Sequence, residues 1–203
     1  MYALVKDNSI SKIITNPKAM VIGDVRYPAK IFQLWSASEL NAIGIYEVIT
    51  DSSNYKDEAY YINTNEEYNF ADNQVTRSWG TATPKKLEDE NAVDEDGKNI
   101  LDDDGNQVIN YGLKTEKKRI VKQQASGLLE KTDWHNHKAL DDDTYTIPDN
   151  IKSYRADVRA KSNEMESQID ACTNVDELKA LYEYTEQEDG TQTRPLAEFP
   201  KEI

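Results

Sequence analysis

The sequence predicts an α+β protein, with a β-rich module in its N-terminal part and a helical module in its C-terminal part. In the N-terminal part, short apolar runs alternate with turn residues, which is typical of β-hairpins and meanders. In the C-terminal part, apolar residues recur every three or four positions, which is typical of amphipathic helices. A strongly acidic stretch separates the two patterns. We expect four parts: a β-rich module (1–84), an acidic linker or hairpin insertion (85–112), a helical module (113–185) and an extended C-terminal arm (186–203).

Two β-hairpins are expected at the beginning of the chain. In the first, Asp7, Asn8 and Ser9 form the turn, and in the second Gly23 and Asp24 do. Glycine at the first central position suits the primed turns, whose twist matches that of paired strands. The strands of the two hairpins are 2–5 with 10–14, and 20–22 with 25–27.

One short helix interrupts the β-rich module. Ser36 and Glu39 have the spacing of a capping box, in which each side chain bonds a free backbone N–H of the other residue. The helix is expected to end near residue 43, with Gly44 as its left-handed stop. The apolar run 45–49 is the next strand.

An aromatic β-meander is expected between residues 58 and 82, because polar turn residues separate the runs 60–62, 68–70 and 75–79. Aromatic side chains are enriched at interface centres, so this meander is also our predicted contact surface. The alternative is that the rings fill the inner face of the meander, which strand alternation favours for about half of them. The predicted contact residues are Tyr60, Tyr61, Tyr68, Phe70 and Trp79.

The acidic stretch, residues 88–104, holds nine acidic residues and one lysine, and it opens an eight-residue near-repeat. Each unit is an acidic Asp-Gly turn, two polar residues and an apolar pair. A small hairpin is possible, with 100–101 and 108–109 as strand ends. The interpretation that we favour is an exposed, solvated loop.

Three helices are expected after the acidic stretch. The first covers 115–130, with a stripe formed by Ile120, Val121, Ala125, Leu128 and Leu129. The second begins at Pro148 and carries the apolar line Ile151, Tyr154, Val158, Ser162, Met165 and Ile169. Thr173 or Asn174 caps the third helix. The last two helices, within 148–182, are expected to form a helical hairpin.

Composition excludes several classes of partner. Lys and Arg number 24 against 38 Asp and Glu, so the formal net charge is −14 and the pI is near 4.6. Nucleic acids and anionic membranes recruit clustered cations, and no apolar run has the length of a spanning helix. We expect neither nucleic acid nor membrane as a partner. The charge is uneven, since residues 114–122 carry five cations and one acid, and pairing with the acidic stretch within one chain or between subunits remains open.

A calcium site fails on spacing. With Gly97 or Gly105 at the sixth position of a helix-loop-helix calcium loop, the first position holds Ala92 or Ile100, neither of which offers an oxygen ligand. The solvated turn is the better interpretation of both units.

Catalytic and metal-binding residues are also not expected. His135 and His137, with Asp133 or Asp141, could hold zinc or iron, but no third ligand stands at a recognised spacing, so a surface or packing role is favoured. Cys172 continues a helical stripe and is interpreted as a buried thiol. We expect no enzyme activity, catalytic residue, cofactor or metal.

One set of residues in the C-terminal module forms a recognisable motif: Leu128-Leu129-x-x-Thr132-Asp133-Trp134, Ile147-Pro148 and Tyr154-Arg155-x-x-Val158-Arg159. With these residues, the module resembles one found in tail assembly chaperone and tail-fibre-associated proteins of tailed bacteriophages. Similarity extends to Asn110-Tyr111-Gly112-Leu113 and to the run from Ile31 to Ile45, so that it covers roughly 20–50 and 108–182.

The residues of this motif have predictable structural roles. Thr132 or Asp133 can cap a helix starting at Trp134, whose ring is expected to close the junction between two helices. Tyr154 and Val158 are expected to pack on the two leucines. The structural residues of the motif are Leu128, Leu129, Asp133, Trp134, Pro148, Tyr154 and Arg155.

The resemblance implies a non-enzymatic tail protein that remains in the virion, next to the tail fibre or baseplate, after assembly in the host cytoplasm. Its partners are then other tail proteins and further copies of itself in a symmetric assembly. The alternative is a tail assembly chaperone, which binds a tail protein transiently and is not retained in the virion.

Overall fold

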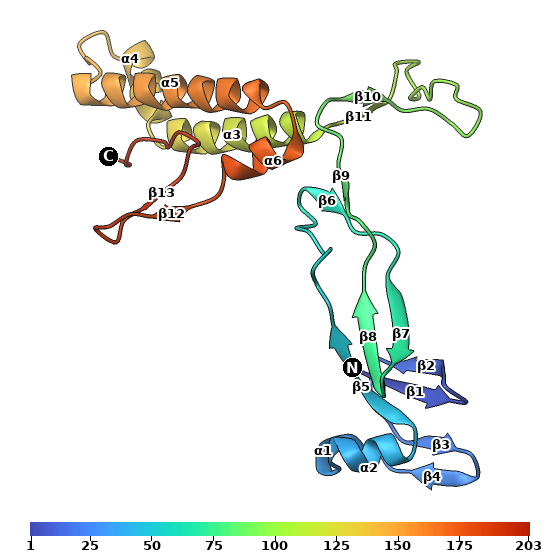
Figure 1. The fold of residues 1–203 in the computed structure, drawn as a ribbon. Coiled ribbons are helices and arrows are strands. Elements are labelled where there is room, and N and C mark those ends of the chain that lie inside the picture. The colour runs from blue at the N-terminus through green and yellow to red at the C-terminus, as the bar shows by residue number, and fades with distance from the viewer. The chain divides into compact units, whose positions relative to one another are not determined.

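The computed structural model describes all 203 residues. They form two compact units, Met1–Thr83 (unit 1) and Pro84–Ile203 (unit 2), drawn in Figure 1. Unit 1 consists mainly of strands and unit 2 mainly of helices, which confirms the α+β prediction. The acidic stretch, the helices and the C-terminal arm, expected as three separate parts, all belong to unit 2.

A five-stranded sheet is the frame of unit 1. Its order is β2 (Ser9–Ile14), β1 (Tyr2–Lys6), β5 (Ile45–Thr50), β8 (Gln74–Ser78) and β7 (Glu67–Ala71). All neighbouring strands are antiparallel except β5 and β8, which run parallel. The two outer strands, β2 and β7, approach each other, so the sheet curls round on itself.

Both faces of this sheet are apolar, because successive residues of a strand point to opposite sides. On one face, α1 (Ile31–Leu34), α2 (Ala37–Ala42) and the hairpin of β3 (Met20–Ile22) and β4 (Val25–Tyr27) enclose a first core. The buried residues of this core are Ile14, Ile31, Phe32, Leu40 and Ile45. On the other face, the curled sheet encloses a second core around Ala3, Val48 and Val75.

Turn chemistry sets the register of the hairpins. Asp7 and Asn8 have φ values of 49° and 60°, and Asp72 and Asn73, between β7 and β8, have 51° and 62°. Consecutive left-handed residues are the mark of the primed turns. Both expected N-terminal hairpins are confirmed.

The predicted meander is wrong in its pairing. β7 and β8 form a hairpin as expected, but β6 (Tyr61–Ile62) does not join their sheet. It pairs instead with β9 (Thr83–Pro84) in a separate two-stranded sheet. The other neighbour of β8 is β5, which precedes it by more than twenty residues. Parallel pairing requires such a long connection, and a local pattern does not reveal it.

The helix α2 is capped as predicted. The Glu39 N–H donates to the Ser36 hydroxyl (3.3 Å), and the Ser36 N–H donates to the Glu39 carboxylate (2.7 Å). The Ser36 hydroxyl also donates to the Glu39 carboxylate (2.7 Å), and this bond, together with that from the Ser36 N–H, lowers the pKa of Glu39. Gly44 follows the helix with φ of +82°, and its carbonyl accepts the Val5 N–H at 2.8 Å. The one-turn helix α1 was not predicted.

Unit 2 is organised around two long helices. α5 (Asp149–Ala171) packs along α3 (Leu113–Glu130), and this is the most extensive contact between helices. All six residues of the predicted apolar line of α5 are buried. The expected hairpin within 148–182 is therefore not the main helix pair, because α6 (Val175–Ala180) is too short to cover the line. The short α4 (Asp133–Asp141) lies between α3 and α5 in the sequence.

The acidic repeat, defined here as residues 92–109, has an ordered backbone. Ala92, Ile100 and Val108, spaced by eight residues, form a closed ring of hydrogen bonds. The Ala92 N–H donates to Val108, the Val108 N–H to Ile100 and the Ile100 N–H to Ala92, at 2.8–2.9 Å. The segment is exposed, as the favoured loop interpretation expected. Its backbone is nevertheless paired: the possible hairpin is present, with a third segment that was not predicted. β10 (Glu90–Asn91) and β11 (Ile109–Asn110) pair next to the ring.

The C-terminal arm packs on the helices. After the small hairpin of β12 (Thr185–Glu186) and β13 (Gln192–Thr193), Leu196 is buried and its N–H donates to the Leu181 carbonyl at 3.0 Å. The amide of Gln168 on α5 bonds the backbone at both Pro195 and Ala197. The first part of the expected extended arm thus folds back as a hairpin, and the part after it is attached along α5 and α6.

Gly44→Ala is expected to destabilise unit 1 by about 2–3 kcal/mol, because the residue is left-handed and its Cβ would lie 2.6 Å from the Val5 carbonyl oxygen. Gly23→Ala is the control, since Gly23 has φ of +59° but open space around its Cβ position. It is expected to cost about 1 kcal/mol. Urea unfolding followed by tryptophan fluorescence measures both, and equal losses would contradict the role of the close approach.

Candidate protein-interaction site

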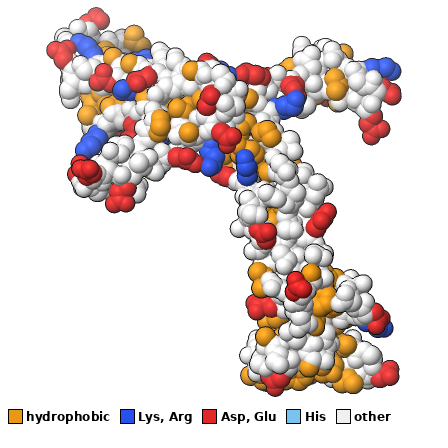
Figure 2. Space-filling model, in the orientation of Figure 1, with side chains coloured by type: hydrophobic (Ala, Val, Ile, Leu, Met, Phe, Trp, Pro, Cys, Tyr) orange, Lys and Arg blue, Asp and Glu red, His pale blue; other side chains and the backbone are white.

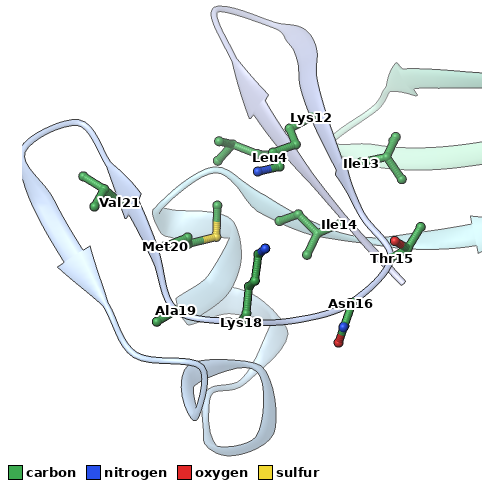
Figure 3. Close-up of a pocket in the computed structure, with 10 residues that line it drawn as sticks. All are labelled: Leu4, Lys12, Ile13, Ile14, Thr15, Asn16, Lys18, Ala19, Met20 and Val21. Atoms are coloured by element: carbon green, nitrogen blue, oxygen red, sulfur yellow. The ribbon is translucent and has the colours of Figure 1, made fainter.

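A hollow of about 430 Å³ lies on unit 1 beside β2 and β3, and we call it the basic hollow (Figure 3). Leu4, Ile14 and Met20 provide its apolar wall. Figure 3 shows the side chains of Lys12 and Lys18 reaching over this wall. A small apolar surface with cations at its mouth suits a ligand that is both apolar and anionic.

Strand register places these residues together. Leu4 of β1 is paired with Lys12 of β2, so their side chains lie on the same face of the sheet. Ile14 is two residues further along β2 and therefore lies on that face too. The chain then turns and brings Lys18 and Met20 back opposite the strand. The hollow is thus the open margin of the first core of unit 1.

The basic hollow has no carboxylate of its own. Its lining includes Lys12 and Lys18 but neither Asp nor Glu. Neither lysine forms an ion pair within unit 1. In a protein of net charge −14, two unpaired cations over one apolar surface form a local site for an acidic ligand.

The predicted aromatic contact surface is corrected for two of its five residues. Tyr60 and Tyr61 are only 6% and 4% exposed, so they are core residues of unit 1 and cannot form an exposed surface. Tyr68 and Phe70 are half-buried and pack on the second core, as the alternative interpretation had it. The Tyr68 hydroxyl donates to Glu66 at 2.6 Å, and this bond raises the pKa of Tyr68.

Trp79 lies in a second, polar hollow of about 450 Å³. Its ring contacts Tyr55, with centroids 4.8 Å apart, and the Arg77 guanidinium lies 4.4 Å from it. Arg77 is already paired with Glu66 at 2.8 Å, and the Tyr55 hydroxyl donates to Glu58 at 2.6 Å. The one cation of this hollow is already paired and both of its carboxylates accept hydrogen bonds from within the chain, so it offers less to an acidic ligand than the basic hollow does.

The motif residues of unit 2 meet at the side chain of Arg155, which is 8% exposed. Its Nη1 donates to the Leu129 carbonyl (2.8 Å) and to the Thr132 hydroxyl (2.7 Å), and its Nη2 pairs with Asp133 (2.7 Å). One guanidinium on α5 thus holds the last turn of α3 and the first turn of α4. We call this arrangement the Arg155 corner. The motif itself gave no prediction of this role for Arg155.

The apolar half of the motif packs as predicted. Tyr154 and Val158 are buried in one cluster with Ala125, against Leu128 and Leu129. Pro148 immediately precedes α5, which begins at Asp149, one residue later than expected. Phe199 of the C-terminal arm joins the same cluster.

Two predictions about the α3–α4 junction are wrong. Trp134 is 54% exposed and does not close the junction. Thr132 precedes α4, but its hydroxyl donates back to the Leu129 carbonyl (3.0 Å) instead of capping the helix. Arg155 holds this junction, which leaves the indole at the surface. Trp134 instead stacks on the neighbouring His135, with ring centroids 3.8 Å apart.

The two histidines have different environments. His135 is buried, and its Nδ1 lies 2.5 Å from the Tyr145 hydroxyl, so the packing interpretation is correct for it. His137 is exposed. No group of three or more His, Cys, Asp or Glu side chains in the chain is arranged to hold a metal ion. Cys172 is buried, and desolvation raises its thiol pKa.

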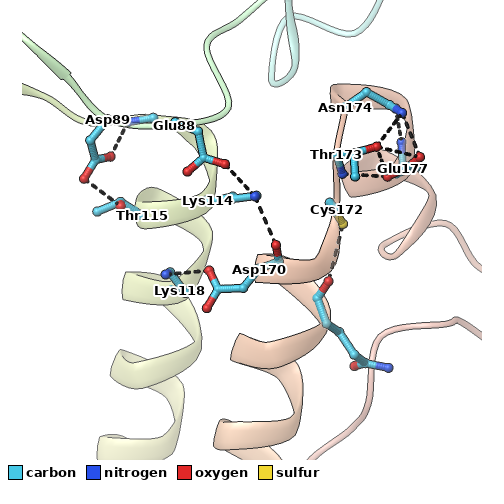
Figure 4. A network of polar contacts seen from close by, with 12 residues as sticks. Glu88, Asp89, Lys114, Thr115, Lys118, Asp170, Cys172, Thr173, Asn174 and Glu177 are labelled. Atoms are coloured by element: carbon cyan, nitrogen blue, oxygen red, sulfur yellow. Dashed lines mark hydrogen bonds and ion pairs between the residues drawn. The ribbon is translucent and has the colours of Figure 1, made fainter.

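The basic start of α3 is paired within the chain (Figure 4). Lys114 pairs with Glu88 at 2.5 Å and Lys118 with Asp170 at 2.7 Å, which raises the pKa of Lys118. Lys122 pairs with Glu166 at 3.2 Å. Pairing within the chain is thus present for these three lysines, and only Glu88 among their partners belongs to the acidic stretch.

Asp89 caps α3 from a distant part of the sequence. Its carboxylate accepts the Gly112 N–H (2.8 Å) and the Thr115 hydroxyl (3.0 Å). Gly112 is needed here, because a Cβ would lie 2.4 Å from the carbonyl carbon of Glu88. The acidic stretch is thereby joined to the helix. No local signal at the helix start identifies a cap that lies more than twenty residues upstream.

A further capping network holds α6, at the right of Figure 4. The Glu177 carboxylate accepts the Thr173 N–H at 2.6 Å, and the Glu177 N–H donates to the Asn174 side chain at 2.9 Å. The predicted cap by Asn174 is confirmed. The backbone bond from Thr173 is the main cause that lowers the pKa of Glu177.

Comparison with protein-family models, with curated proteins and with solved structures finds no match for this chain. None of its helices combines the length and the hydrophobicity that crossing a membrane requires. The candidate sites therefore rest on the geometry above and on the resemblance of the motif.

Replacing Arg155 by methionine is expected to destabilise unit 2 by about 2–3 kcal/mol, because the Leu129 carbonyl, the Thr132 hydroxyl and Asp133 lose their donor. Lys152→Met on the same helix is the control, since its pair with Asp149 is exposed, and it is expected to change stability by less than about 0.5 kcal/mol. Equal midpoints for the two variants in urea unfolding would contradict the role of the corner.

Glu177 is expected to titrate below its ordinary value of 4.5. Because the folded state favours its ionised form, its contribution to stability is present above the unfolded pKa and is lost as pH falls through the folded pKa. NMR titration of the Glu177 carboxyl carbon measures this directly. In Glu177→Gln, the loss of stability on acidification is expected to be smaller than in the wild type. A carboxyl that titrates at or above 4.5 would refute the cap.

Proposed function

We propose that this chain is a non-enzymatic protein of the tail of a tailed bacteriophage, incorporated in the virion next to the tail fibre or baseplate. It assembles in the host cytoplasm, and its partners are other tail proteins and further copies of itself. Unit 1 provides one contact surface and unit 2 another, so that the chain connects neighbours in the assembly.

The Arg155 corner carries this proposal. The motif that resembles phage tail proteins uses Leu129, Asp133 and Arg155 to join three helices. The resemblance is therefore one of architecture, and it supports the tail role by analogy with the proteins that the motif resembles.

Surfaces suited to protein contacts support the same role. Trp134, from the motif, exposes an indole that the corner does not need for packing. Tryptophan is among the side chains most enriched where protein interfaces gain their affinity. The basic hollow of unit 1 is a second surface of this kind, apolar with a charged rim.

Mass spectrometry of purified phage particles tests the proposal. We expect peptides of the chain in particles purified on a density gradient and washed at high salt, in a constant ratio to the other tail proteins. The matched control is the lysate of the same infection, where the chain must also be detected. Presence in the lysate with absence from particles would overturn the structural role and favour the chaperone.

A further inference from the structure

Two charged surfaces have no ion-pair partner within their own unit. One is the basic hollow of unit 1, with Lys12 and Lys18. The other is the tip of the acidic repeat in unit 2, where Figure 2 shows acidic side chains gathered. Glu95, Asp96, Asp103 and Asp104 at this tip are exposed, and their carboxylates form no ion pair.

Hydrogen bonds within the tip define its shape. Asp102 accepts the N–H groups of Asp104 (3.0 Å) and Asn106 (2.8 Å), which holds the turn and lowers the pKa of Asp102. The carboxylates of Asp103 and Asp104 are left for other partners. Leu101, immediately before the turn, is 57% exposed. The turn thus combines an exposed leucine with two adjacent carboxylates.

The basic hollow has the complementary composition. Leu4, Ile14 and Met20 give it an apolar wall for a leucine, and Lys12 and Lys18 give it two cations for two carboxylates. Apolar contact at the centre with charges at the rim is the usual anatomy of a protein interface. The lysines at the start of α3 cannot take this role, because they are already paired.

We propose that the second turn of the acidic repeat of one copy, Leu101 to Asn106, docks in the basic hollow of a second copy. The first turn is the poorer ligand, because Lys98 stands where the second turn has Asn106 and would repel Lys12 and Lys18. The contact joins two different surfaces, so it propagates from copy to copy and closes a ring or continues as a chain. This inference does not depend on the tail role, since it concerns the purified protein alone.

Sedimentation of the purified 203-residue chain is the test. At about 0.01 M salt, where the screening length is about 30 Å, the average mass is expected to rise with concentration above the monomer's 23.2 kDa. At about 1 M salt, it is expected to return to the monomer. A wild type that stays monomeric at low salt up to high concentration would overturn the proposal, as a contact within one chain would also leave it monomeric.

Charge reversal identifies the two surfaces. Lys12→Glu with Lys18→Glu, and separately Asp103→Lys with Asp104→Lys, are each expected to give monomers at low salt. Lys6→Glu with Lys30→Glu is the matched control for the Lys12 and Lys18 variant, because it makes the same change in net charge outside the hollow. It is expected to self-associate like the wild type. Circular dichroism checks that each variant is folded; all of these side chains are exposed.

The four reversals combined in one chain provide the decisive result. In this variant the hollow is acidic and the turn is basic, so the two surfaces are complementary again and self-association is expected to return. If the folded quadruple variant stays monomeric, or if the control dissociates like the first variant, the pairing of these two surfaces is wrong.

Discussion

The Arg155 guanidinium is the constraint on which unit 2 depends. A buried charge is tolerated only when its hydrogen bonds are satisfied, and here a carbonyl, a hydroxyl and a carboxylate from the α3–α4 corner satisfy it. The corner in turn sets where α3 ends, so that Leu128 and Leu129 meet Tyr154 and Val158. The C-terminal arm closes the same cluster through Phe199. The packing of these apolar side chains thus depends on the bonds of the Arg155 guanidinium.

A shared device compensates for the modest apolar content of 37%. Many aspartates in this chain accept the backbone N–H of the residue two positions later, and this bond fixes a turn without any core. The aspartates concerned are Asp51, Asp57, Asp94, Asp102, Asp142 and Asp189. Part of the net charge of −14 is therefore structural, because these carboxylates replace packing as the means of ordering loops.

Local chemistry explains which features the sequence predicted. Turn residues such as Asp7 and Asn8, the capping box of Ser36, and the stripe of α5 act within a few residues, so their patterns are readable. Ile120 shows the limit of a pattern, since it belongs to the predicted stripe of α3 but is 41% exposed.

The features that the sequence did not predict depend on contacts between distant segments. The parallel pairing of β5 with β8 and the cap that Asp89 provides to α3 both join residues more than twenty positions apart. The exposure of Trp134 follows from the same cause, because a guanidinium from α5 holds the junction that the indole was expected to close. Of the candidate site, the sequence identified Arg155 as a motif residue, but the basic hollow depends on how the chain returns after β2 and has no local signature.

The closed ring of Ala92, Ile100 and Val108 limits how the acidic repeat can evolve. Each of these residues donates one hydrogen bond to the ring and accepts one, so all three N–H groups and all three carbonyls are used. Ladders of strands can be lengthened because their edges remain open, whereas a ring of three has no edge for a fourth member. If another eight-residue unit were added by duplication, its backbone could not join the ring. The number of units is set by closure, and variation in this segment is confined to what the turns carry.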